Sequence, residues 1–138
     1  MKTSAYTLAL LGMILVLAGT PRVQAQTPLV TDTITRQLEA FKQDDFETAF
    51  RFASPMIKGM FGSSQRFGQM VRQGYPMVWR PADVRYGAAV EDGPTVRQLV
   101  IITDGAGTLH YLEYEMIPGA EGWVINGVRR VESPEVGV

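Results

Sequence analysis

The feature that most constrains the fold of this chain is an alternation of apolar and polar residues near the C-terminus. It occupies residues 107–131, GTLHYLEYEMIPGAEGWVINGVRRV, and is interrupted by a turn around Pro118 and Gly119. Because successive side chains of a strand point to opposite faces, one face of the two runs collects large apolar residues. These are Leu112, Tyr114, Met116, Trp123 and Ile125. The pattern predicts two half-buried antiparallel strands that the rest of the chain must cover.

Two more strands are predicted ahead of this pair, at residues 82–90 and 95–103. Gly-containing turns at residues 92–94 and 104–107 separate the strands. Connections this short join antiparallel neighbours, so the four strands are predicted to form a meander. On the first strand, alternation places four residues on one face: Val84, Tyr86, Ala88 and Val90.

Short amphipathic helices between residues 31 and 74 are predicted to supply the cover. The first begins near Thr31 or Asp32, and its apolar stripe is Ile34, Leu38 and Phe41. The second begins at Asp44, which is interpreted as an N-cap with Glu47 as its capping-box partner. Its expected inward residues are Phe46, Ala49, Phe50 and Ala53. Helices this short are unstable alone and need a sheet to pack on.

Two further helices are predicted from residues typical of helix ends. The expected boundaries are Ser54 and Pro55 with Gly62, then Ser63 or Ser64 with Gly74. The expected inward residues are Ile57, Met60, Phe61, Phe67, Met70 and Val71. Residues 75–81 contain two prolines and are predicted to form an extended, non-helical hinge between the helical half and the sheet half.

The N-terminus has the pattern of a secretory signal peptide over residues 1–25. Lys2 precedes an apolar run at residues 5–18, and the run Val23-Gln24-Ala25 has the small residues of a cleavage site before Gln26. A membrane anchor is the alternative, but the run is shorter than the roughly 20 residues that span a bilayer. We expect an exported protein, periplasmic or extracellular. It would have a mobile leader at 26–30, one α+β domain at 31–132 and a flexible tail at 133–138.

The composition narrows the possible functions. The chain of 138 residues has a formal charge of −1, so it lacks the basic excess of a nucleic-acid-binding protein. It contains no cysteine, which excludes disulfides, thiolate metal sites and a thiol nucleophile. One histidine and scattered carboxylates predict no metal site and no cofactor. Membrane contact is expected only through an uncleaved signal segment.

The second predicted strand departs from alternation. Leu99, Val100, Ile101 and Ile102 are apolar in succession, which indicates burial on both faces of the sheet. The helices can cover only one face, and soluble monomers rarely expose a large apolar patch. We therefore expect a homodimer through the outer face of the sheet, with Val100 and Ile102 in the contact. Docking on a larger exported partner is the alternative.

Four stretches of the chain resemble the bacterial family called domain of unknown function 4864: residues 37–55, 67–85, 109–117 and 122–129. The first is QLEAFKQDDFETAFRFASP and the last is GWVINGVR. Helices followed by an antiparallel sheet also resemble the nuclear-transport-factor-two-like fold. This resemblance implies a curved sheet wrapped by helices into a cone with an interior cavity. Relatives in that fold include ketosteroid isomerase, scytalone dehydratase and pure binding modules, so it does not decide between catalysis and binding.

Alternation places aromatic residues on the concave face that would line such a cavity. The expected ligand-binding residues are Tyr75, Trp79, His110, Tyr114 and Trp123. His110 could act as a general acid or base with Tyr114, because the unperturbed pKa of histidine lies near neutral pH. It could equally be a strand-end residue bonded to a turn. Alternation sends Glu113 and Glu115 to the opposite face, so no carboxylate is available as its catalytic partner.

Three arginines lie in or near the predicted hinge, residues 75–81, which carries Tyr75 and Trp79. They are Arg72, Arg80 and Arg85. Their planar guanidinium groups could bind an anion bidentately, or they could pair with nearby carboxylates at the surface. The sequence therefore leaves two functions open. The first is a module that binds a small apolar or amphipathic ligand, or a protein partner, without catalysis. The second is a small isomerase, dehydratase or hydrolase that uses His110 with Tyr114.

Overall fold

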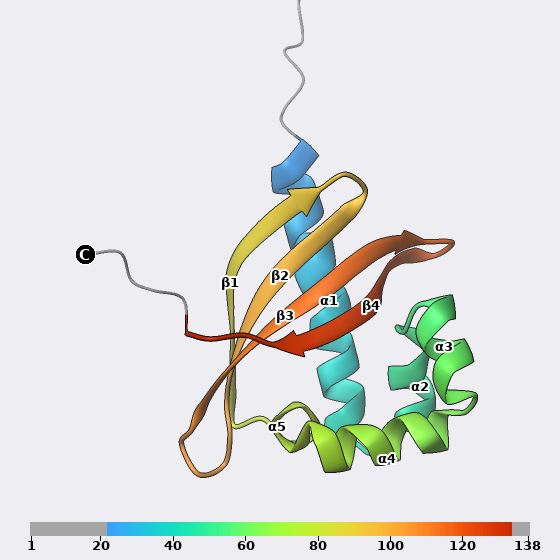
Figure 1. Ribbon diagram of the computed structural model, residues 1–138, viewed down its shortest axis with the longest axis vertical. Coiled ribbons are helices and arrows are strands. Elements are labelled where there is room, and N and C mark those ends of the chain that lie inside the picture. Colours follow the sequence, from blue (N-terminus) through green and yellow to red (C-terminus); the bar gives the residue numbers. More distant parts are fainter. Residues whose placement is uncertain (1–21, 134–138) are drawn as a thin grey trace, which may run out of the picture.

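The structure is a computed structural model that describes the backbone of residues 22–133 and the side chains of residues 29–133. Most of the predicted signal peptide and of the predicted C-terminal tail lies outside these residues. The described chain is an α+β fold in which five helices precede a four-stranded sheet. Figure 1 shows α1 running along one face of the sheet, with the shorter helices grouped beside and below its lower half.

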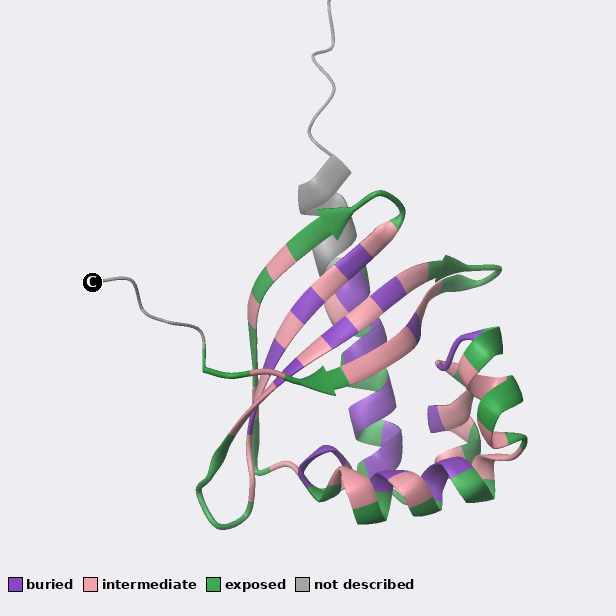
Figure 2. Cartoon of the chain, viewed as in Figure 1, coloured by how far each residue is buried: buried purple, intermediate pink, exposed green. Residues whose placement is uncertain are grey.

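The sheet is the predicted antiparallel meander. Its strands are β1 (Asp83–Asp92), β2 (Thr95–Thr103), β3 (Leu109–Gly119) and β4 (Gly122–Arg130). They lie in the order β1-β2-β3-β4, with every neighbouring pair antiparallel. Along β2 and β3 buried residues alternate with partly buried ones, as Figure 2 shows. The prediction from period-2 alternation is thus confirmed for β3, whereas β2 also alternates although its run of apolar residues predicted burial on both faces.

The inner face of the sheet consists of residues that α1 and the shorter helices cover. Buried residues on it are Val96, Gln98, Val100, Ile102, Leu112, Tyr114, Met116 and Ile125. Trp123 packs against this core on the same side as Tyr114, two residues before Ile125. Val100 and Ile102 were predicted to lie on the outer face, which is wrong. Their neighbours Leu99 and Ile101 lie there instead and are half-buried.

A register shift between Tyr86 and Ala89 changes the predicted facing of β1. After the shift Ala89 packs against the core, whereas Val90 is exposed. The prediction that Ala88 and Val90 share the inner face with Val84 is therefore wrong. A bulge adds one residue to a strand, and each residue beyond it points to the opposite face.

Helix α1 (Arg22–Lys42) is longer than predicted. It was expected to begin at Thr31 or Asp32, but residues 26–30, predicted as a leader, are helical. Val30 is fully buried and continues the stripe of Ile34, Leu38 and Phe41 toward the N-terminus. The packing of this added turn on the sheet explains why the helix starts before Thr31.

The turn after α1 uses Asp44 differently from the prediction. Helix α2 (Phe46–Arg51) is capped by Asp45, whose carboxylate accepts a hydrogen bond from the backbone N–H of Thr48 at 3.1 Å. Asp44 instead has φ 57°, a left-handed conformation that aspartate tolerates better than most residues. This conformation directs the chain out of α1 and frees the Asp44 carboxylate for another contact.

Helices α3 (Pro55–Phe61) and α4 (Ser64–Gly74) have the predicted caps. The Ser54 side chain accepts from the backbone N–H of Ile57, Gly62 ends α3 with φ 77°, and Ser63 caps α4. Ser54 also donates to Asn126 Oδ1 at 2.8 Å, which ties the start of α3 to β4. Met60, predicted to point inward, is 66% exposed.

The predicted non-helical hinge contains a short helix, α5 (Pro76–Trp79). Pro76 stands at its first turn, where a missing N–H costs nothing. The prediction considered proline as a helix breaker and overlooked this position. Met77 and Val78 are buried, so the segment is part of the core.

Candidate ligand pocket

A pocket of about 380 Å³ opens between the helices and the end of the sheet formed by β3 and β4. We call it the α3 pocket, because α3 forms its outer wall. The residues that line it are Gln37, Phe41, Ala53, Met56, Ile57, Met60, Phe61, Phe67, Met70, Val71, Tyr75, Val78, Tyr114, Ile125, Asn126, Gly127 and Val128. They come from α1, the α2–α3 segment, α3, α4, the α4–α5 segment, α5 and two strands. The fold therefore assembles the pocket from segments far apart in the sequence.

The lining of the α3 pocket is apolar. Among the described residues that form it, none carries a charge at neutral pH, and four have polar side chains. Gln37 donates to the carbonyl oxygen of Ala49 at 3.1 Å, and the Tyr75 hydroxyl donates to that of Val128 at 3.3 Å. Asn126 accepts from Ser54 and donates to Glu115 at 3.2 Å. These bonds use polar groups of three of the four side chains to hold the pocket walls together.

The fourth polar side chain, Tyr114, has no such bond. It is fully buried on β3, and its hydroxyl has no hydrogen-bond partner among the described residues. Burial raises the pKa of the Tyr114 hydroxyl well above its usual value, with smaller contributions from Tyr86 and Tyr75. The hydroxyl is therefore uncharged at neutral pH and able to donate one hydrogen bond. A buried hydroxyl without a partner is costly, and buried polar groups usually have one.

The outer wall of the pocket is weakly anchored. Helix α3 contains no buried residue, although six of its seven residues are uncharged. Met56 is 55% exposed, and Met60, one turn further along the helix, is 66% exposed. Methionine is flexible and adapts to irregular apolar partners. The two exposed methionines of this wall can therefore adapt to an apolar ligand.

His110 does not line the α3 pocket. Its Nε2 lies 2.7 Å from Asp104 Oδ2 at the β2–β3 turn, where the other carboxylate oxygen accepts from the backbone N–H groups of Ala106 and Thr108. The bond to His110 is the main reason why the pKa of Asp104 is lowered. His110 and Tyr114 are four residues apart on one strand, roughly 13 Å along it. The structure does not bring them together as an acid–base pair.

Of the other predicted ligand-binding residues, Tyr75 lies in the pocket lining and two do not. Trp123 packs against the edge of the core. Trp79 lies in a separate cluster with Asp44, Arg72 and Arg80. Whether Tyr75 or Tyr114 binds a ligand stays a prediction, as does any such role for Trp79, His110 and Trp123.

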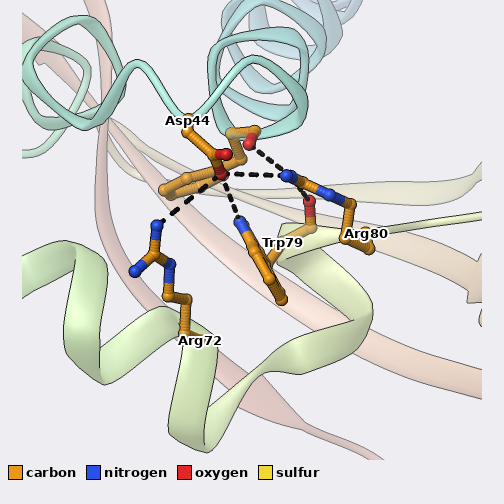
Figure 3. Close-up of polar contacts among 5 residues, drawn as sticks. Asp44, Arg72, Trp79 and Arg80 are labelled. Carbon is orange, nitrogen blue, oxygen red and sulfur yellow. Dashed lines mark hydrogen bonds and ion pairs between the residues drawn. The ribbon is translucent and has the colours of Figure 1, made fainter.

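The cluster around Asp44 joins the end of α1 to α4 and α5 (Figure 3). Asp44 Oδ1 accepts from Trp79 Nε1 at 2.8 Å and from Arg80 Nη2 at 2.9 Å, and Arg72 Nη2 lies 3.8 Å away. The guanidinium groups of Arg72 and Arg80 also lie over the Trp79 ring, at 5.2 Å and 4.2 Å from its centroid. The bond from Trp79, followed by that from Arg80, lowers the pKa of Asp44.

This cluster bears on the predicted anion site. Arg72 and Arg80 both face the Asp44 carboxylate, and Arg85 pairs separately with Asp83 at 3.2 Å. The three arginines thus do not converge on one site. The carboxylate partner of two of them already occupies the position that an incoming anion would take, so their geometry fits a structural clamp.

Comparison with known proteins places this fold in a family. The family model described as "Domain of unknown function (DUF4864)" matches residues 23–138. The chain belongs to this family. No curated protein sequence matches the chain. The family assignment agrees with the resemblance seen in the sequence, and it leaves the activity open.

Two solved structures are similar to this member of the family. One is a Campylobacter jejuni protein described as an NTF2-like transpeptidase, with TM-score 0.51, 8% identity, and coverage of 70% of this chain and 97% of the other. The other is the SEC-C motif containing protein RPA3114 from Rhodopseudomonas palustris, with TM-score 0.49, 15% identity, and coverage of 83% and 95%. The first shows an NTF2-like fold. At such low identity it says nothing of the reaction or ligand.

The described part of this family member shows two further features. Within residues 29–133 no three acidic or histidine side chains gather as ligands for a metal ion. No helix in residues 22–133 is long and apolar enough to cross a membrane.

Sequence reasoning missed the contribution of α3 to the pocket. The signal was present in the two exposed methionines, one turn apart in a helix that also carries Ile57 and Phe61.

Proposed function

We propose that this protein is a binding module that takes a small apolar or amphipathic ligand into the α3 pocket. The observation that carries the proposal is the uncharged lining of that pocket. Its volume of about 380 Å³ lies within the range of small-molecule sites, which are mostly apolar with a few oriented polar groups. The polar groups here are Gln37, Tyr75, Tyr114 and Asn126.

Two features favour binding over the isomerase, dehydratase or hydrolase alternative. General acid–base catalysis needs a titratable group within hydrogen-bond reach of the substrate. His110 is bonded to Asp104 and is not part of the lining, and the lining itself holds no carboxylate. Burial raises the pKa of the Tyr114 hydroxyl, so this group stays protonated at neutral pH and cannot act as the general base. A ligand in this pocket would meet groups that orient it but none that exchanges protons with it at neutral pH.

Filling the pocket tests the proposal. The neutral fluorescent probe N-phenyl-1-naphthylamine should bind the wild-type domain saturably. Replacing Ile57, which lines the pocket from α3, by tryptophan should weaken probe binding by about tenfold or more, because the indole ring occupies the space that the probe needs. The measurement is a fluorescence titration of the probe with each protein.

The matched control is Gly59→Trp, on the same helix. Gly59 is not part of the pocket lining, and a side chain added there meets no atom within 4 Å. This variant should bind the probe as the wild type does. Equal weakening by both substitutions, or no saturable binding by the wild type, would refute the proposal. Independently of the probe, mass spectrometry of small molecules that copurify with the domain would identify a natural ligand or show that none is retained.

We further propose that the module is exported, and that it forms a homodimer through the outer face of its sheet. The signal-peptide pattern of residues 1–25 supports export. Leu99 and Ile101, half-buried on the face of β2 away from the helices, support the dimer. Native mass spectrometry of protein recovered from the exported fraction should give twice the mass of residues 26–138. A mass that includes residues 1–25 would refute cleavage, and a monomer at micromolar concentration would refute the dimer.

A further inference from the structure

Among the described residues that line the α3 pocket, Tyr114 has the polar side chain that the fold leaves without a hydrogen bond. Tyr114 stands at the centre of the sheet, between Gln98 on β2 and Val128 on β4 in the strand register. A tyrosine ring could be replaced here by phenylalanine with no loss of apolar packing. The fold instead keeps a buried hydroxyl without a partner on a residue that lines the pocket. An unpaired polar group of this kind suits a site that is completed by its ligand.

The surroundings of the Tyr114 hydroxyl limit what can bind to it. Moving an ionised group into an apolar site is expensive unless a counter-charge is present. Among the described residues that line the α3 pocket there is no such charge. The hydrogen bonds of Gln37, Tyr75 and Asn126 hold parts of the protein itself. A polar group of a ligand inside the pocket should therefore be uncharged, and the Tyr114 hydroxyl is the buried lining group that lacks a partner.

The opposite end of the ligand meets different residues. The mouth of the pocket is formed by α3, where Met56 and Met60 are exposed and apolar. A carboxylate that stayed in solvent at the mouth would leave the Tyr114 hydroxyl unpaired. A molecule that enters with its oxygen first satisfies the hydroxyl and leaves its apolar part against the methionines. The two ends of the pocket thus favour one orientation.

We infer that the α3 pocket selects uncharged apolar molecules that carry one oxygen function, such as an alcohol, ether or ketone, bound with that oxygen on the Tyr114 hydroxyl. This inference rests on the proposed binding function and adds a ligand class and an orientation to it. Anionic lipids and carboxylates of the same size are rejected by the absence of a counter-charge. Fully apolar molecules fit the pocket but leave Tyr114 without a partner.

Three probes of the same shape test the inference: naphthalene, 2-naphthol and 2-naphthoate. Isothermal titration calorimetry at neutral pH measures the dissociation constant of each for the wild-type domain and for Tyr114→Phe. The wild type should bind 2-naphthol about three- to tenfold more tightly than naphthalene, the range expected for one hydrogen bond. It should bind 2-naphthoate more weakly than 2-naphthol. In Tyr114→Phe the preference for 2-naphthol over naphthalene should disappear, while naphthalene still binds.

The Tyr114→Phe variant should fold, because it removes a buried hydroxyl that has no partner. Its melting temperature without ligand should equal or exceed that of the wild type. Gln98→Met is the matched control. Gln98 is the cross-strand neighbour of Tyr114, and its Oε1 is also buried without a partner, but it does not line the pocket. This control should keep the preference for 2-naphthol.

The outcomes separate the inference from the proposed function. Binding of naphthalene without any preference for 2-naphthol overturns the oxygen-first ligand class and leaves apolar binding intact. Tightest binding of 2-naphthoate also overturns it. A preference that survives in Tyr114→Phe, or that Gln98→Met removes as well, shows that Tyr114 is not the selecting group. If no probe binds the wild type, the proposed function itself fails.

Discussion

Phe41→Ala is expected to lower the free energy of unfolding by about 3–5 kcal/mol, the cost of truncating a buried phenylalanine and leaving a cavity. Phe41 is almost fully buried near the end of α1. Its ring centroid lies 6.2 Å from that of Phe46 and 5.8 Å from that of Phe67, so one side chain joins α1 to α2 and α4. Of these helices, α1 and α4 also contribute residues to the lining of the α3 pocket. A loss of this size is a large part of the 5–15 kcal/mol typical of a domain.

The measurement is equilibrium unfolding in urea, with the slope of the transition compared between variants. Met60→Ala is the control, because Met60 also lines the α3 pocket but is largely exposed. Its free energy of unfolding should change by no more than about 0.5 kcal/mol. If the two variants lost similar amounts, the packing of α1 on α2 and α4 through Phe41 would be wrong.

The strands could be predicted because one physical signal dominates them. Alternation over β3 and β4 sorts side chains into a buried and an outer face, and the short turns leave only antiparallel pairing. The caps at Ser54 and Ser63 could be predicted for a similar reason, since a hydroxyl next to a helix start satisfies a free backbone N–H. These signals are local, and the structure follows them.

The parts that could not be predicted depend on contacts between distant segments. The register shift after Tyr86 has no strong local signal, although Gly87 lies within it. A Cβ added at Gly87 would come within 2.6 Å of Leu99 Cδ2, so a larger residue there would have to displace a side chain of the neighbouring strand. Asp44 was assigned to a cap because its partners, Trp79 and Arg80, lie on a segment some 35 residues later.

The candidate site was predicted only in part for the same reason. Tyr114 was placed correctly on the concave face by alternation, whereas Tyr75 was named only as an aromatic residue of the predicted hinge. His110 shares the face of Tyr114 but lies at the start of β3, and alternation carries no information about position along a strand. The outer wall of the pocket was missed because Met60 was counted as core, whereas α3 lies over the pocket with its methionines exposed.

Gly59 and Gly68 are both helical, but replacing each by alanine should change the stability of the domain in opposite directions. A Cβ added to Gly68 in α4 would lie 2.7 Å from two ring atoms of Phe46, whereas one added to Gly59 in α3 meets no atom within 4 Å. Both Gly→Ala changes gain about 1 kcal/mol of helix propensity. Only Gly68→Ala must also displace the Phe46 ring, and overpacking of this kind costs about 1–3 kcal/mol.

Gly59→Ala should therefore stabilise the domain by about 0.5–1 kcal/mol, and Gly68→Ala should destabilise it. Since the propensity gain is common to both, the difference between their free energies of unfolding isolates the steric cost at Phe46. Thermal or urea unfolding of the two variants beside the wild type measures this difference. Stabilisation by both substitutions would show that α2 does not rest on Gly68. The Phe46 ring, which packs on Phe41, would then lie away from α4.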